Sequence, residues 1–110
     1  MFEIKQKAKM TERALLIAAF TESANEAHAQ SLLEELEELV ATLGIPVVER
    51  KLVFHRENHA RYLIGSGKAQ ELADLAKHLE CDVLVFDNSL SPSQQRNWEE
   101  LAGMTVADRE

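Results

Sequence analysis

Apolar residues in this chain gather in runs whose spacing predicts the secondary structure. Residues 14–20 form an unbroken apolar run, and residues 82–87 contain a shorter one. Continuous runs of this length are typical of strands covered on both faces, as in parallel sheets. Residues 47–54 alternate less cleanly and contain three consecutive charged residues, which indicates an edge strand. Residues 104–107 predict a short last strand.

The first helix is predicted over residues 24–43. Ser23 and Glu26 have the spacing of a capping box, and leucines and a valine follow at helical spacing. The expected apolar face consists of Leu32, Leu33, Leu36, Leu39, Val40 and Leu43. Gly44 and Pro46 should end the helix, because glycine accepts the left-handed cap and proline cannot continue it.

Two further helices separate the remaining strands. One is predicted over residues 67–80, after a tight glycine turn, with Ser66 as its N-cap. The other is predicted over residues 92–102, because Ser91 is followed by a proline at the first helical position and by a glutamine three residues on. Gly103 should end it.

The element order is therefore βαβαβαβ, which predicts an α/β fold with three layers. Right-handed crossovers place helices on both faces of a four-stranded, mainly parallel sheet with strand order 2-1-3-4. A ligand crevice is expected where the winding reverses, beyond residues 21–23 and 88–89. Residues 13–110 should form one domain, and residues 1–12 an arm that is either an edge strand or a loose tail.

Composition changes this picture in a few respects. Aromatic residues make up 5% of the 110 residues, which predicts an aliphatic core. The single cysteine, Cys81, excludes an internal disulfide and a cysteine-cluster zinc site. His55 and His59 lie four residues apart without an evident third ligand, so no metal site is predicted. No apolar run reaches the length of a membrane span and no signal peptide is evident, so the chain is expected in the cytoplasm.

Charge is distributed unevenly along the chain. The formal net charge is -7, yet residues 50–68 contain five basic residues and one acidic residue. Such a stretch predicts a positive face able to meet RNA phosphates, unless its side chains pair with the glutamates of residues 34–38. The candidate RNA-binding or anion-binding residues are Arg56, Arg61, Gly65, Ser66, Gly67 and Lys68.

The glycines at this site do not complete a nucleotide-binding motif. A P-loop would require glycine in place of Tyr62 and a serine or threonine in place of Ala69. The dinucleotide motif would require glycine in place of Gln70. The helix start at Gly67 could still bind a phosphate through its backbone N–H groups, or the glycines could serve only a tight turn. No catalytic arrangement is present, and no catalytic residue is predicted.

Four stretches together resemble the amino-terminal domain of the HflX family of GTP-binding proteins. They are Tyr-Leu-Ile-Gly-Ser-Gly-Lys at residues 62–68, Asp87, Leu-Ser-Pro-Ser-Gln-Gln-Arg-Asn at residues 90–97, and Asp-Arg at residues 108–109. The resemblance covers about residues 13–110. The family motif at the third helix start comprises Ser91, Gln94, Gln95, Arg96 and Asn97.

The resemblance implies a role in translation. Members of the family are ribosome-associated GTPases that bind the large ribosomal subunit and separate stalled ribosomes. The expected partners are therefore ribosomal RNA and the GTPase domain of a parent chain, and the expected role is a regulatory module that contacts the ribosome. GTP and Mg²⁺ would belong to the missing GTPase domain, so no cofactor is expected in this chain. The alternative is a domain that binds a small nucleotide, ATP or GTP, in the strand-end crevice.

This chain alone is expected not to hydrolyse GTP above background, because it lacks a P-loop and a base-reading N-K-x-D motif. The measurement is phosphate release from GTP and Mg²⁺ by the purified chain. A parallel preparation from cells without the chain accounts for contaminating GTPases, and saturable release above that control would contradict the prediction.

Overall fold

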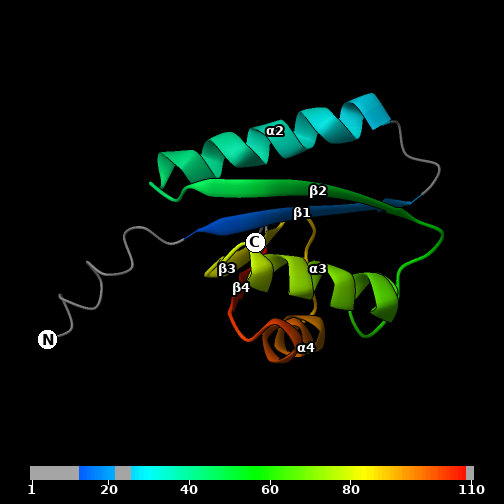
Figure 1. Ribbon diagram of the computed structural model, residues 1–110. Coiled ribbons are helices and arrows are strands. Elements are labelled where there is room, and N and C mark those ends of the chain that lie inside the picture. Colours follow the sequence, from blue (N-terminus) through cyan, green and yellow to red (C-terminus); the bar gives the residue numbers. More distant parts are fainter. Residues whose placement is uncertain (1–12, 22–25, 109–110) are drawn as a thin grey trace, which may run out of the picture.

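The structure is a computed structural model that describes residues 13–21 and 26–108. The predicted arm of residues 1–12, together with Ser23 of the predicted capping box and Arg109, lies outside the described residues. The elements are β1 (Ala14–Thr21), α2 (Glu26–Thr42), β2 (Val47–His55), α3 (Ser66–His78), β3 (Val83–Phe86), α4 (Pro92–Ala102) and β4 (Thr105–Ala107). Each strand begins and ends within one residue of its predicted bounds (Figure 1).

The strands of this sheet are all parallel and lie in the order β2-β1-β3-β4, as predicted. β1 is central, and its Ile17 pairs with Lys51 of β2 on one side and with Phe86 of β3 on the other. The charged strand β2 lies at an edge, where its outer backbone groups can reach water.

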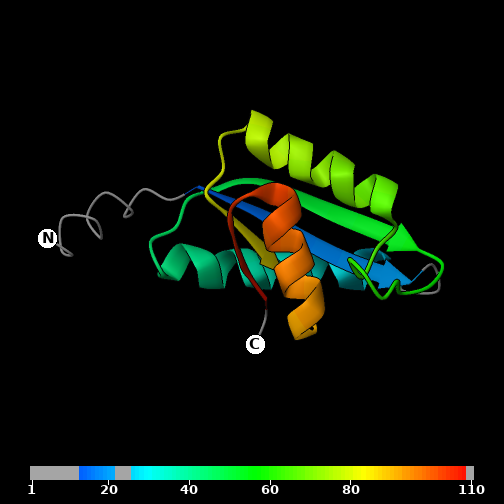
Figure 2. The ribbon, with the colours of Figure 1, turned by 90° about the horizontal axis from the view of Figure 1, so that it is seen from below.

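Helices cover both faces of the sheet. α2 lies on one face, and α3 and α4 lie on the other (Figures 1 and 2). β1 contributes side chains to the hydrophobic clusters on both faces of the sheet, because alternate residues of a strand point to opposite faces. Leu15 and Ile17 pack in the cluster under α3 and α4, whereas Leu16 and Ala18 pack in the cluster under α2. This double burial explains the unbroken apolar run of β1.

The predicted aliphatic core is found on both faces, but the layer under α3 and α4 also buries aromatic rings. Trp98 and Phe86 are the largest fully buried side chains there, and their ring centroids lie 5.0 Å apart. Tyr62 meets Trp98 edge to face at 5.6 Å. Composition undercounts these rings, because a few aromatic side chains supply a large share of the buried area.

The predicted apolar face of α2 is wrong at two positions. Leu33, Leu36 and Val40 are buried, whereas Leu39 is 56% exposed and Leu43 is 75% exposed. α2 packs on β1 and β2, so only one stripe of the helix reaches the sheet. Leu39 lies beside that stripe, and Leu43 lies in the turn directly after α2.

The start of α3 also differs from the prediction. Gly65 occupies the N-cap position with φ -60°, and Ser66 is the first helical residue rather than the N-cap. Gly65 and Gly67 do not adopt positive φ; in this loop Leu63 does, at 73°. The presence of glycine at positions 65 and 67 is therefore not explained by a left-handed backbone conformation there.

α4 begins and ends as predicted. The Ser91 side chain accepts a hydrogen bond from the Gln94 backbone N–H at 3.1 Å, and the Gln94 side chain accepts one from the Ser91 N–H at 2.9 Å. Gly103 follows with φ 68°, the left-handed conformation that glycine favours.

Replacing Trp98 by phenylalanine should destabilise the domain by about 1–3 kcal/mol, because a buried backbone carbonyl of Tyr62 loses its donor. Urea unfolding followed by circular dichroism measures this change. The control is Glu99→Ala, an exposed neighbour on the same helix, which should stay within about 0.5 kcal/mol of wild type. Equal stability of Trp98→Phe and wild type would contradict the assigned hydrogen bond.

Candidate nucleic-acid interface

Arg56 and Arg61 lie on the connection between β2 and α3, and Lys68 lies in the first turn of α3. We name residues 56–65 the basic loop; it leaves the carboxyl end of β2 and leads into the first turn of α3. Its midsection is closed by two backbone hydrogen bonds of 2.9 Å, one in each direction between His59 and Leu63. The loop therefore has a defined shape of its own.

The second half of the basic loop is anchored in the core. Tyr62, Leu63 and Ile64 are each at most 7% exposed and pack with Trp98 and the α3 side chains. Leu63 holds a left-handed conformation that a branched side chain tolerates poorly, so the surrounding packing must impose it. Anchoring this half leaves Arg61, directly before it, on the surface.

Polar side chains of α4 hold the same loop by its backbone. The Gln94 side chain donates to the His59 carbonyl at 3.1 Å, and the Asn97 side chain donates to the Arg61 carbonyl at 3.0 Å. The Trp98 indole N–H donates to the Tyr62 carbonyl at 2.9 Å. Three carbonyls of a loop about 36 residues away in sequence are thus satisfied from one helix.

These contacts give structural roles to most of the family-motif residues. Gln95 donates to the Val106 carbonyl at 3.0 Å, which ties α4 to β4. The Asp108 carboxylate accepts from the Leu90 N–H at 2.8 Å and so joins two stretches of the motif. The sequence predicted Gln94 as part of the capping box but not its hydrogen bond to the His59 carbonyl. Residue spacing does not show which backbone carbonyl a helix side chain will meet.

The basic side chains at this site differ in whether they form an ion pair. Arg56, Arg61 and Arg96 are exposed, and none of them pairs with a carboxylate in the described part of the chain. The Arg61 guanidinium lies 5.3 Å from the centroid of its neighbour's ring, Tyr62. Lys68 contacts Glu71 at 3.4 Å, an exposed pair worth only about 0–1 kcal/mol.

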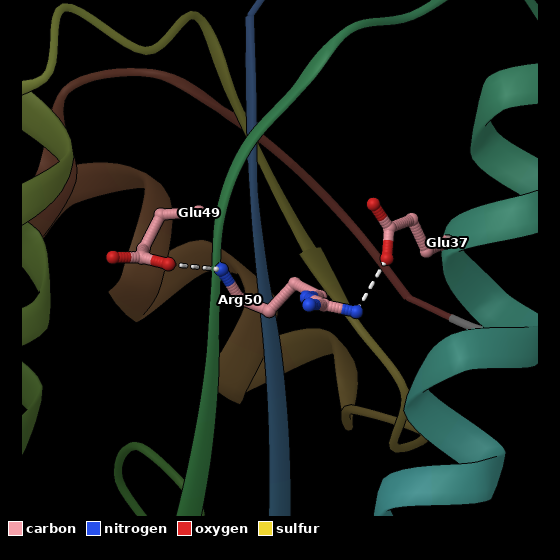
Figure 3. Close-up of polar contacts among 3 residues, drawn as sticks. All are labelled: Glu37, Glu49 and Arg50. Atoms are coloured by element: carbon pink, nitrogen blue, oxygen red, sulfur yellow. Dashed lines mark hydrogen bonds and ion pairs between the residues drawn. The ribbon is translucent and has the colours of Figure 1, made fainter.

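Arg50, in contrast, belongs to the opposite face. Its side chain extends from β2 toward α2 and meets the Glu37 carboxylate at 2.7 Å, while Glu49 points the other way (Figure 3). The Glu49 carboxylate accepts from the Arg50 backbone N–H at 3.0 Å. Pairing with the acidic helix therefore accounts for Arg50 and not for the cations of the basic loop.

The first turn of α3 presents backbone donors without a side-chain cap. Gly65 at the N-cap has no side chain, and no side-chain hydrogen bond caps this helix. Ser66, Gly67 and Lys68 in this turn are exposed. A helix start of this kind favours an anion, because its N–H groups point outward and the helix dipole is positive there.

At the expected strand-end crevice, a side chain predicted to line it bonds to the backbone of β1. The Asn88 side chain accepts from the Ala19 N–H at 2.9 Å and donates to the Ala19 carbonyl at 2.8 Å. It thereby continues the pairing of β1 with β3 beyond the last strand residue. Glu22 and Ser23, also predicted to line the crevice, lie outside the described residues.

The described residues give little basis for metal binding, a reactive thiol or a membrane span. Among residues 13–21 and 26–108 there is no group of three or more His, Cys, Asp or Glu that could hold a metal ion. His55 contacts the Asn58 side chain at 2.7 Å. Burial raises the pKa of the Cys81 thiol, which keeps it protonated and unreactive. No helix of this described part is long and apolar enough to cross a membrane.

Comparison with known proteins decides the family. Residues 30–110 match the family model described as GTP-binding GTPase N-terminal. The chain belongs to this family. The resemblance to HflX proteins, carried in the sequence by the motifs around α3 and α4, is confirmed.

Several curated relatives carry the name GTPase HflX. The relative from Akkermansia muciniphila is 47% identical over 110 residues, which is all of this chain and 25% of the relative. The Escherichia coli relative is 38% identical over 77 residues, 70% of this chain and 18% of its own length. The Thermococcus kodakarensis relative is 45% identical over 79 residues, 68% of this chain and 17% of its own length. The chain thus spans at most about a quarter of these relatives.

Replacing Asn97 by alanine should loosen the basic loop at a cost of about 0.5–1.5 kcal/mol, because the Arg61 carbonyl loses its donor. The measurement is amide hydrogen exchange at His59 and Leu63, whose mutual bonds close the loop. Exchange should accelerate there and remain unchanged in β1. Arg96→Ala is the matched control, since Arg96 has no described partner. Unchanged exchange in Asn97→Ala would show that the Asn97 hydrogen bond does not hold the loop.

Proposed function

We propose that this domain is the ribosomal-RNA-contacting regulatory module of an HflX-type GTPase and has no catalysis of its own. The observation that carries the proposal is the basic loop: its backbone is held by α4, while its arginines remain exposed and form no ion pair with any described residue. A loop ordered in advance loses little entropy on binding. Membership of a GTPase family supports the same role.

The chemistry of the loop suits a phosphate backbone. Arg56 and Arg61 supply guanidinium groups, and Lys68 supplies a point charge beside the uncapped start of α3. Ser66 and Gly67 add backbone donors in the same turn. Such contacts would position the domain on RNA without reading its sequence. Arg96 on α4 is the further candidate for a phosphate contact.

The remaining parts of the proposal concern the whole protein. GTP and Mg²⁺ would be bound by a GTPase domain in the part of the relatives that this chain does not cover. That domain and the large ribosomal subunit would be the partners, and separation of ribosomal subunits would be the outcome. The cytoplasm, where ribosomes work, would be the location.

Binding of a small nucleotide is the alternative, and the geometry favours it less. Both polar ends of the Asn88 side chain, which was expected to line that crevice, are already bonded to the Ala19 backbone. A separate hollow of about 540 Å³ lies between β2 and α3, lined in part by Lys51 and Lys68. Glu71 and Asp74 line it as well, and their carboxylates oppose a phosphate.

The test is binding to large ribosomal subunits by the triple variant Arg56→Ala/Arg61→Ala/Lys68→Ala at two salt concentrations. Each lost phosphate contact should reduce the salt slope of binding by roughly one unit, so the variant should lose about three units and bind more weakly. Arg50→Ala is the matched control, because it removes one charge of the same stretch on the opposite face.

Two results would argue against the proposal. Wild-type binding by the triple variant at both salt concentrations would place the ribosomal contact elsewhere in the parent protein. Saturable binding of ATP or GTP with little salt dependence, lost in the same variant, would favour the nucleotide alternative.

A further inference from the structure

One aromatic ring of this domain remains at the surface. Phe54, the last residue but one of β2, is 36% exposed and is the one aromatic side chain among the exposed large apolar residues of the described chain. It lies in register with Phe20 of β1, and the two ring centroids are 6.1 Å apart with 34° between the ring planes. Phe20 packs against the hydrophobic cluster under α2. The pair therefore lies on the α2 face, at the carboxyl end of the sheet.

The edge position of β2 explains why one side of this ring is open. Phe20 covers Phe54 from β1, and no strand of the described sheet lies on the other side of β2. Leu52, two residues earlier on the same face of β2, packs against the cluster under α2. The apolar cover of the sheet thus ends at Phe54. Its ring rests against Phe20 on one side and presents aromatic surface to water on the other.

The basic loop begins two residues after this ring. Consecutive Cα atoms are about 3.8 Å apart, so the Cα atoms of Phe54 and Arg56 lie within about 8 Å of each other. His55, between them, contacts the Asn58 side chain at 2.7 Å across the bend that follows β2. Arg56 is exposed and forms no ion pair with any described residue. An aromatic surface and a guanidinium group thus lie next to each other at the end of the edge strand.

RNA with unpaired bases fits this combination. A base inside a double helix is stacked on both faces, so a protein ring reaches only the bases of single strands, loops and bulges. Every base has a π face, so such stacking tolerates any sequence. Removing the aromatic partner of one base weakens binding by about 5- to 150-fold. A neighbouring arginine can meet the phosphate of the same nucleotide.

A protein partner suits this surface less well. A stable protein interface buries about 800 Å² on each partner, and charged residues are depleted at its centre. Here a single partly exposed ring lies next to Arg56, and the same edge strand contains three consecutive charged residues at positions 49–51. The apolar surface is large enough for one base and too small for a stable protein interface.

We propose that Phe54 is a stacking surface for one unpaired base of the bound RNA, and that Arg56 contacts the phosphate of that nucleotide. The inference rests on the proposed RNA contact and adds the kind of RNA that is bound: a nucleotide outside a double helix, held without reading its sequence. The arginines supply the part of the affinity that falls with salt, because they replace counterions at phosphates. The ring supplies a part that releases no counterion.

The test measures binding of the purified chain to large ribosomal subunits at two salt concentrations. Leucine keeps an apolar side chain against Phe20 but has no π face. Phe54→Leu should therefore bind about fivefold or more weakly than wild type at both concentrations, with the wild-type salt slope. Phe54→Tyr keeps the aromatic face and should bind like wild type.

Two controls make the result specific to stacking. Phe20→Leu removes the other ring of the pair and should retain wild-type affinity; every variant is first checked for the wild-type denaturation midpoint. A fully paired RNA duplex exposes no base face, so wild type and Phe54→Leu should bind it equally.

Several outcomes would overturn the inference. Wild-type affinity of Phe54→Leu for the ribosomal subunit, with a reduced salt slope in the triple variant, would remove the stacked base and leave the RNA contact intact. Absence of any wild-type binding would remove both. Equal weakening by Phe54→Leu and Phe54→Tyr, or weaker duplex binding by Phe54→Leu, would show that the ring acts through packing. A changed oligomeric state of Phe54→Leu with unchanged RNA binding would assign the ring to a contact between copies of the chain.

Discussion

The buried indole of Trp98 joins α4 to the sheet and to the basic loop. Its ring packs on Phe86 of the sheet and on Tyr62 of the basic loop, and its N–H satisfies the Tyr62 carbonyl. Because the side chain is fully buried, an unpaired carbonyl beside it would be costly. The position of the loop is therefore tied to the packing of α4 on the core.

The side chains that hold the loop in position differ from the side chains that it presents to solvent. Gln94 and Asn97 donate to loop carbonyls and stabilise the loop's shape. The arginines of the loop are left in water, where they can exchange hydration for phosphate oxygens. Arg50 shows the opposite arrangement, since its charge is balanced by Glu37 on the other face. The family motif around α4 is thus explained first by structure, and only through the loop by the proposed RNA contact.

The two faces of the sheet are covered differently. On the side of α3 and α4, both helices and the basic loop cover a core that includes the rings of Tyr62, Phe86 and Trp98. On the side of α2, a single helix leaves Leu39 and Leu43 beside an open groove.

The sequence by itself determined the α/β class, the strand order and the family, because each depends on local signals. Unbroken apolar runs, capping residues and the handedness of crossovers leave few alternatives, and the motifs at residues 62–68 and 90–97 are specific. Only the tertiary structure decided which side chains meet. It gave Asn97 and Trp98 their loop carbonyls, separated Arg50 from the basic loop, and left Leu39 and Leu43 exposed. Helical spacing shows which residues share a face of a helix, but the width of the surface beneath it depends on where every other element packs.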